Sequence, residues 1–265
     1  MSATLSNPIP ISASEGEVLN KALIQGLNNE DPRERLIVAL DLSTAAAARQ
    51  IVAAVGDCAL TYKVGMQLYT AEGPQVVRDL VASGRRVFLD LKYHDIPNTV
   101  GAAVREAAQL GVSMLTVHAT GGSRMLKAAV EAAKHDAAGS KAGLRVLAVT
   151  VLTSMDEADL EPTGVPGLVK EQVLRLARLA LANGCHGVIA SAREAPALRS
   201  ELGNNFAIVT PGVRPVGSGH ADQRRVVTPA EAIAAGASHI VVGRPITEAA
   251  DPAAEAKAIL RQISG

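Results

Sequence analysis

Two opposite charges interrupt an apolar segment, at positions 90 and 92 of the run RVFLDLKYHDIPNT. Residues two apart on a β-strand point to the same face, so Asp90 and Lys92 share one face. Leu89 and Leu91 then take the other face, and Asp95 follows three residues after Lys92. Buried charges are costly unless they pair with each other or meet a ligand. An ammonium group between carboxylates can stabilise developing negative charge and donate a proton, which indicates a catalytic role. The alternative interpretation of these charges is a purely structural ion pair.

Glycine and arginine recur in the segments VTPGVRP and VVGRPIT, in the last quarter of the chain. Gly212 and Gly243 would let backbone amides approach a ligand closely. Arg214 and Arg244 would add positive charge and fork-shaped donors, a pattern that favours phosphate binding. The long stretch 212–222 is predicted to act as a lid. The alternative is an ordinary loop with solvated arginines.

Short β-branched runs closed by polar residues predict the strands that must position these groups. They span residues 36–41, 59–64, 86–92, 114–118, 145–152, 186–190, 206–210 and 239–243. Ala-rich amphipathic helices are predicted between them, at 44–55, 100–110, 124–135, 170–183 and 229–235. Ser43 is the predicted N-cap of the first helix. This alternation predicts an α/β fold, a (β/α)8 TIM barrel, with an open doubly wound sheet as the alternative.

Polar side chains gather where the predicted strands end, which is where a (β/α)8 barrel carries its chemistry. They are Asp41, Lys63, Asp90, Lys92, His118, Thr153, Ser154, Ser191, Arg214 and Arg244. All are expected to point to one rim. His118 is expected either to line the site or to be a satisfied core residue. The spacing of the histidines predicts no metal site.

Composition excludes several classes of protein. The 265 residues carry 26 basic and 26 acidic side chains, which argues against binding to nucleic acid polymers or anionic membranes. Aromatic residues make up 2%, too few for a base-stacking surface. No apolar run is long enough for a membrane helix, and the first residues lack the pattern of a signal peptide. The two cysteines form no disulfide framework, so a cytoplasmic location is expected.

One catalytic barrel domain is predicted over residues 33–265. Residues 1–32 do not join the strand–helix pattern and are predicted to form a loosely held N-terminal extension. A regulatory or dimer-contacting arm is the alternative.

The segment DLKYHDIPNT, residues 90–99, resembles the signature of the orotidine 5′-phosphate decarboxylase family. From about residue 35 onward, further segments resemble the family in order and spacing: ALDLS, YKVGMQLYTAEGP, VHATGG, VLTSM, TPGVRP and VVGRPIT. The resemblance implies decarboxylation of orotidine 5′-monophosphate to uridine 5′-monophosphate in pyrimidine biosynthesis, without a metal or cofactor. It also implies a homodimer with shared active sites.

The resemblance further implies roles for individual residues. The catalytic array consists of Lys63, Asp90, Lys92 and Asp95. Within it, Lys92 is expected to protonate C6 of the pyrimidine, and Asp95 and Thr99 are expected to reach across the dimer interface. The implied substrate-binding residues are Asp41, Lys63, Ile96, Thr99, Thr153, Pro211, Arg214, Gln223, Gly243 and Arg244.

Two other functions remain open. Magnesium-dependent sugar-phosphate decarboxylases and aldolases of the same superfamily share the D-x-K-x-x-D pattern, but they place a metal-binding Glu where this chain has Lys63. An ammonium group there would repel the metal. A non-catalytic nucleotide-binding barrel is expected to have lost one of the four charges of the array, and all four are present.

Overall fold

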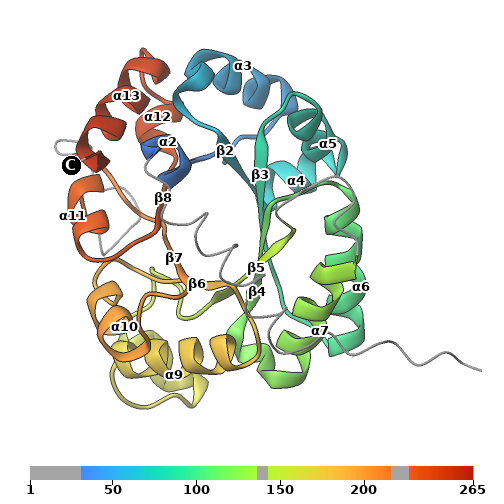
Figure 1. Ribbon diagram of the computed structural model, residues 1–265, viewed down its shortest axis with the longest axis vertical. Coiled ribbons are helices and arrows are strands. Elements are labelled where there is room, and N and C mark those ends of the chain that lie inside the picture. The colour runs from blue at the N-terminus through green and yellow to red at the C-terminus, as the bar shows by residue number, and fades with distance from the viewer. Residues whose placement is uncertain (1–30, 136–142, 216–226, 265) are drawn as a thin grey trace, which may run out of the picture.

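Eight parallel strands close into a barrel in the computed structural model (Figure 1). The structure describes residues 31–135, 143–215 and 227–264. The strands are β1 (Leu36–Ala39), β2 (Thr61–Gly65), β3 (Arg86–Tyr93), β4 (Met114–His118), β5 (Arg145–Val149), β6 (Gly187–Ile189), β7 (Ala207–Thr210) and β8 (His239–Val242). The barrel closes where β1 pairs in parallel with β8, with Val38 opposite Val242. The predicted (β/α)8 barrel is confirmed, and the open-sheet alternative is wrong.

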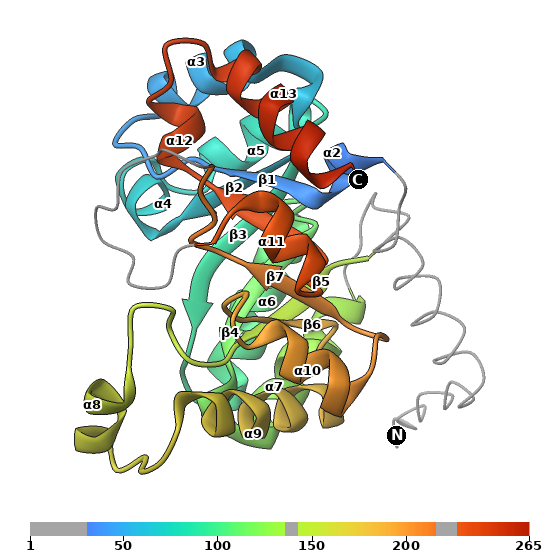
Figure 2. The ribbon, with the colours of Figure 1, turned by 90° about the vertical axis from the view of Figure 1, so that its left-hand side faces the viewer.

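Helices surround the barrel (Figure 1). They are α2 (Pro32–Arg35), α3 (Ala45–Val55), α4 (Met66–Glu72), α5 (Gln75–Ala82), α6 (Pro97–Gln109), α7 (Gly122–His135), α8 (Glu157–Leu160), α9 (Val169–Ala182), α10 (Ala195–Leu202), α11 (Pro229–Ala234), α12 (Arg244–Thr247) and α13 (Pro252–Ile263). Short 3₁₀ turns lie at Gly56–Cys58, Ala119–Gly121 and Glu161–Thr163. Figure 2 shows α8 standing away from the barrel wall. The helices α2, α4, α5, α8, α10, α12 and α13 were not among the predicted ones.

Apolar side chains fill two layers on the two faces of the strands. The inner cluster contains Ile37, Ala39, Phe88, Met114, Leu147, Val149, Ile189, Ala207, Val209 and Val241. The outer cluster includes the alternate residues Leu36 and Val38, which pack under the surrounding helices. Because both faces are covered, β1 is buried along its whole length, and its sequence reads as an unbroken apolar run.

The start of α3 differs from the prediction. Thr44, not Ser43, is the N-cap, because its hydroxyl accepts a hydrogen bond from the backbone N–H of Ala47 at 3.2 Å. The Ser43 hydroxyl instead accepts from Gln67 Nε2 at 3.0 Å. This bond ties the loop after β1 to the first turn of α4.

The first described residues form a short helix, α2, which leads directly into β1. The Asp31 carboxylate caps α2 by accepting from the backbone N–H of Arg33 at 2.9 Å. Residues 1–30 lie outside the described residues, so the extension 1–32 and the barrel domain 33–265 stay predictions. Within the described ranges, no helix has the length and apolar character needed to cross a membrane.

Candidate active site

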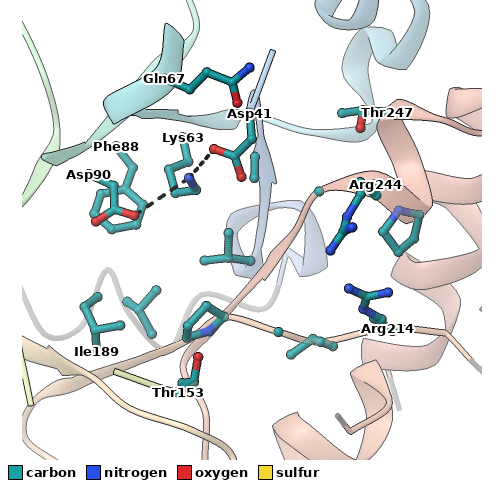
Figure 3. A pocket seen from close by; sticks show the side chains of 18 of the residues that line it. Asp41, Lys63, Gln67, Phe88, Asp90, Thr153, Ile189, Arg214, Arg244 and Thr247 are labelled. Carbon is teal, nitrogen blue, oxygen red and sulfur yellow. Dashed lines mark hydrogen bonds and ion pairs between the residues drawn. The ribbon is translucent and has the colours of Figure 1, made fainter. Parts of the chain in front are cut away.

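Charged side chains form a continuous chain at the rim where the first three strands end. Lys63 Nζ, on β2, lies 2.7 Å from Asp41 Oδ1 and 3.7 Å from Asp90 Oδ2 on β3. Figure 3 shows these three side chains in line. Lys92 Nζ donates to both oxygens of Asp90, at 3.0 and 2.9 Å. The order of charges is therefore negative, positive, negative, positive, and each buried charge has an opposite neighbour that offsets its desolvation.

This chain of charges runs from solvent into the mouth of the barrel. The Asp41 side chain is 56% exposed, whereas the side chains of Lys63 and Asp90 are 11% and 13% exposed. Gly65, at the end of β2, makes the close packing feasible, because a Cβ there would lie 2.9 Å from Asp41 Oδ1 and 3.0 Å from Lys63 Nζ. The cations are thus held in a water-poor site, where fixed charges act more strongly than in bulk water.

A cavity of about 490 Å³ extends from these charges to the loops after β7 and β8. Arg214 and Arg244 lie together on the side of the cavity opposite Asp90 (Figure 3). Gly212, in the same wall, has a φ of 76°, which favours glycine. Two neighbouring guanidinium groups favour a phosphate or carboxylate at this end. The volume is within the range of sites for small ligands.

Apolar side chains also line the cavity. They are Ala39, Leu42, Phe88, Val149, Val151, Leu152, Ile189, Val209, Pro211, Val213, Val241 and Pro245. Thr153 places a hydroxyl on this wall (Figure 3). The cavity therefore suits a ligand with an anionic group at the arginine end and a partly apolar body, with Lys92 at the other end.

Most of the predicted site residues line this one cavity. They are Asp41, Lys63, Asp90, Lys92, Thr153, Pro211, Arg214, Gly243 and Arg244. Asp95, Ile96 and Thr99 do not line it; they are exposed around the start of α6. The Asp95 carboxylate accepts from the backbone N–H of Ile96 at 2.6 Å. Gln223 and residues 216–222 of the predicted lid lie outside the described residues.

Sequence reasoning missed several lining residues, among them Phe88, Gln67 and Thr247. Phe88 had a usable signal, because it lies two residues before Asp90 and so shares its face of β3. Gln67 lies in the first turn of α4 and Thr247 ends α12. Both lie in segments that resemble the family, YKVGMQLYTAEGP and VVGRPIT, but neither residue was singled out within them.

His118, at the end of β4, is half-buried and lies outside the cavity lining. Its ring centroid is 5.4 Å from that of His94, which is exposed. Burial, and then the nearby His94 and Lys92, lower the pKa of His118 below its usual value. The neutral form of the ring is thereby favoured.

Two carboxylates of this site, those of Asp41 and Asp90, already pair with ammonium groups. Lys63 Nζ lies between the carboxylates of Asp41 and Asp90, 2.7 Å from the first and 3.7 Å from the second. Over the three described ranges of the chain, no group of three or more His, Cys, Asp or Glu side chains is arranged to hold a metal ion.

Comparison with known proteins identifies the family. A family model described as "Orotidine 5′-phosphate decarboxylase / HUMPS family" matches residues 34–259. The chain belongs to this family. The resemblance seen in the sequence is thereby confirmed, and the match covers every strand of the barrel.

Relatives and solved structures of the orotidine 5′-phosphate decarboxylase / HUMPS family match most of the chain. The orotidine 5′-phosphate decarboxylase of Halorhodospira halophila (strain DSM 244 / SL1) is 53% identical over 230 residues, which are 87% of this chain and 96% of the relative. That of Anaeromyxobacter sp. (strain K) is 52% identical over 228 residues, 86% of this chain and 97% of the relative. The crystal structure of the enzyme from Lactobacillus acidophilus has a TM-score of 0.78 and 40% identity, covering 87% of this chain and 99% of that one.

Proposed function

We propose that this protein decarboxylates orotidine 5′-monophosphate to uridine 5′-monophosphate in pyrimidine biosynthesis, with no metal or organic cofactor. The names of its relatives support the reaction. One observation of the site carries the proposal: the alternating charges of Asp41, Lys63, Asp90 and Lys92 at one end of a cavity that has two arginines at the other.

Lys92 is proposed as the proton donor. When the bond from C6 to the carboxyl group breaks, its electron pair stays on C6, in the plane of the ring, where the π system delocalises it poorly. The Lys92 ammonium stabilises this charge and then transfers a proton to C6, so that CO2 and uridine 5′-monophosphate are the products. Asp90 contributes by holding Lys92 Nζ through both carboxylate oxygens, which fixes the cation before the reaction begins.

The remaining lining residues are proposed to bind the substrate. Arg214 and Arg244 would hold the 5′-phosphate, and Thr153 would bond the pyrimidine. Asp41 and Lys63 line the same cavity and would contact the ribose hydroxyls, as the family resemblance implies. Phosphate binding remote from C6 can then position the ring against Lys92.

Independence from magnesium is proposed on the charge of Lys63. Its ammonium lies between the carboxylates of Asp41 and Asp90, where it repels a cation and occupies the oxygens that would bind one.

A reducing, cytoplasmic location is proposed from the cysteines. The two thiols of the described chain are free, Cys185 buried and Cys58 partly buried.

A homodimer with shared sites is proposed because the fourth charge of the array, Asp95, is exposed and outside its own chain's cavity. Ile96 beside it leaves 66% of its area exposed, an apolar side chain that a partner subunit would cover. Asp95 and Thr99 would then complete the site of the other chain.

The reaction is tested by following the absorbance of orotidine 5′-monophosphate with purified protein, with and without EDTA. Turnover that EDTA leaves unchanged is expected. No turnover would reject the proposed reaction, and activity lost with EDTA and restored by Mg²⁺ would favour the metal-dependent alternative.

Shared sites are tested by mixing the inactive variants Asp95→Ala and Lys92→Ala. Hybrid dimers would contain one intact site, so activity is expected to return as subunits exchange. Subunit exchange without any recovery would contradict the proposed position of Asp95.

A further inference from the structure

The backbone of β3 leaves regular strand geometry at the proposed proton donor. Leu89 pairs with Leu115 of β4, and the next matched pair is Tyr93 with Val117. Residues 90–92 of β3 therefore lie opposite a single residue of β4, Thr116. Lys92 has a φ of 51°, and it is the one non-glycine residue in the described ranges with a positive φ. Such a conformation is unfavourable for lysine and persists only where the surroundings hold it.

The Thr116 hydroxyl supplies the hydrogen bonds that the irregular strand needs. It accepts from the backbone N–H of Lys92 at 2.9 Å and donates to Asp90 Oδ1 at 2.9 Å. A hydroxyl has one proton, so the bond to Asp90 fixes where that proton points. Thr116 is fully buried, so no solvent molecule competes for these bonds at its surface.

Thr116 thus holds Lys92 from two sides. One bond fixes the backbone of Lys92 in its left-handed conformation, and the other fixes the carboxylate to which Lys92 Nζ donates. Thr116 does not line the cavity, so it acts through these two residues rather than on a ligand.

We infer that Thr116 is a positioning residue for the decarboxylation: its hydroxyl sets the place and direction of the Lys92 ammonium at C6. This inference rests on the proposed role of Lys92. It also explains why the strained backbone occurs at this residue, because a regular strand would carry the ammonium elsewhere relative to the substrate.

The test compares Thr116→Val with Thr116→Ser, using kcat, KM and the Kd of uridine 5′-monophosphate. Valine has the shape of threonine without its hydroxyl, and serine keeps the hydroxyl. Because misplacement of a reacting group by about 1 Å can cost about 100-fold in rate, kcat of Thr116→Val is expected to fall about 10- to 100-fold. KM and the Kd are expected to change less than about 3-fold, since the phosphate and pyrimidine contacts are untouched. Thr116→Ser is expected to keep kcat within about 3-fold of the wild type.

Thr150→Val is the matched control. Thr150 is also buried, and its hydroxyl donates to the carbonyl of Ile189 at 2.8 Å, so its loss removes a buried hydrogen bond that does not reach the charges. The Tm of Thr150→Val is expected to fall by about as much as that of Thr116→Val, whereas its kcat is expected to stay unchanged. If Thr116→Val does not fold, Thr116→Cys takes its place, because a thiol is a weak hydrogen-bonding group of similar size.

A wild-type kcat in Thr116→Val or Thr116→Cys, alongside an inactive Lys92→Ala protein, would overturn the inference and leave the proposed function intact. A fall of kcat in Thr116→Ser equal to that in Thr116→Val would also overturn it, because the hydroxyl would then not be the group that positions Lys92. An active Lys92→Ala protein would instead overturn the proposed function.

Discussion

A methyl group added at Gly65 is expected to separate Asp41 from Lys63. The new Cβ would lie 2.9 Å from Asp41 Oδ1 and 3.0 Å from Lys63 Nζ, closer than carbon approaches such atoms. Gly65 has φ −96° and ψ −178°, a conformation that alanine adopts without strain. The substitution Gly65→Ala therefore acts on the ion pair rather than on the backbone. Asp41 is the more exposed partner and is expected to move into solvent, leaving Lys63 with Asp90 alone.

The magnitude follows from the exposure of the two partners. An ion pair with one half-exposed member contributes about 1 kcal/mol, so the free energy of unfolding should fall by about 1 kcal/mol or less. Loss of a fixed charge beside the reacting groups is expected to cost about 1–2 kcal/mol of transition-state stabilisation, which corresponds to about 5- to 30-fold in kcat/KM.

Steady-state assay of Gly65→Ala, Lys63→Ala and the double variant tests this reasoning. The double variant should be no worse than Lys63→Ala, because Asp41 then has no ion pair with Lys63 for the methyl group to break. Gly101→Ala is the control, since a Cβ there makes only ordinary contacts, the nearest 3.5 Å from the Ala128 carbonyl. Wild-type kcat/KM in Gly65→Ala, or additive losses in the double variant, would refute the reasoning.

Two further results are expected. Arg244→Ala should raise KM by about 10-fold or more, because the substrate loses a charge-assisted hydrogen bond to its phosphate. An unchanged KM would contradict the assignment of Arg244 to the phosphate site. Burial lowers the pKa of His239 to about 3 and that of His186 to about 4, so both stay neutral when folded while the unfolded chain takes up protons below about pH 6.5. The free energy of unfolding, measured in urea, should therefore fall by about 2 kcal/mol per histidine between pH 7 and pH 5. In His239→Met this fall should be about 2 kcal/mol smaller than in the wild type. The same pH dependence in both proteins would contradict the assignment of the fall to His239.

The barrel could be predicted from the sequence because its signal is local and repeated. Buried strands such as β1 need apolar residues on both faces, so each leaves a short unbroken apolar run followed by polar residues at the rim. Asp90 and Lys92 stood out for the same reason, as charges in a run that is otherwise apolar. The parallel order of strands then brings Arg214 and Arg244 to the rim that carries these charges.

The conformation that aims Lys92 could not be predicted in this way. The rule of alternating faces assumes a regular strand, whereas residues 90–92 lie opposite Thr116 alone, and that register depends on how β3 and β4 pair in space. The role of Gly65 is likewise set by side chains from two neighbouring strand ends. Thr44 replaces Ser43 as a helix cap because Gln67, distant in sequence, bonds the serine.

Product formation by Lys92→Ala tests the central claim most directly. Conversion of orotidine 5′-monophosphate is measured for the wild type and the variant, together with the Kd of uridine 5′-monophosphate as a check that the variant is folded. The account predicts no detectable turnover with product binding retained within about 10-fold, since the phosphate end of the cavity is unchanged. Turnover near that of the wild type would contradict the assignment of Lys92 as the proton donor.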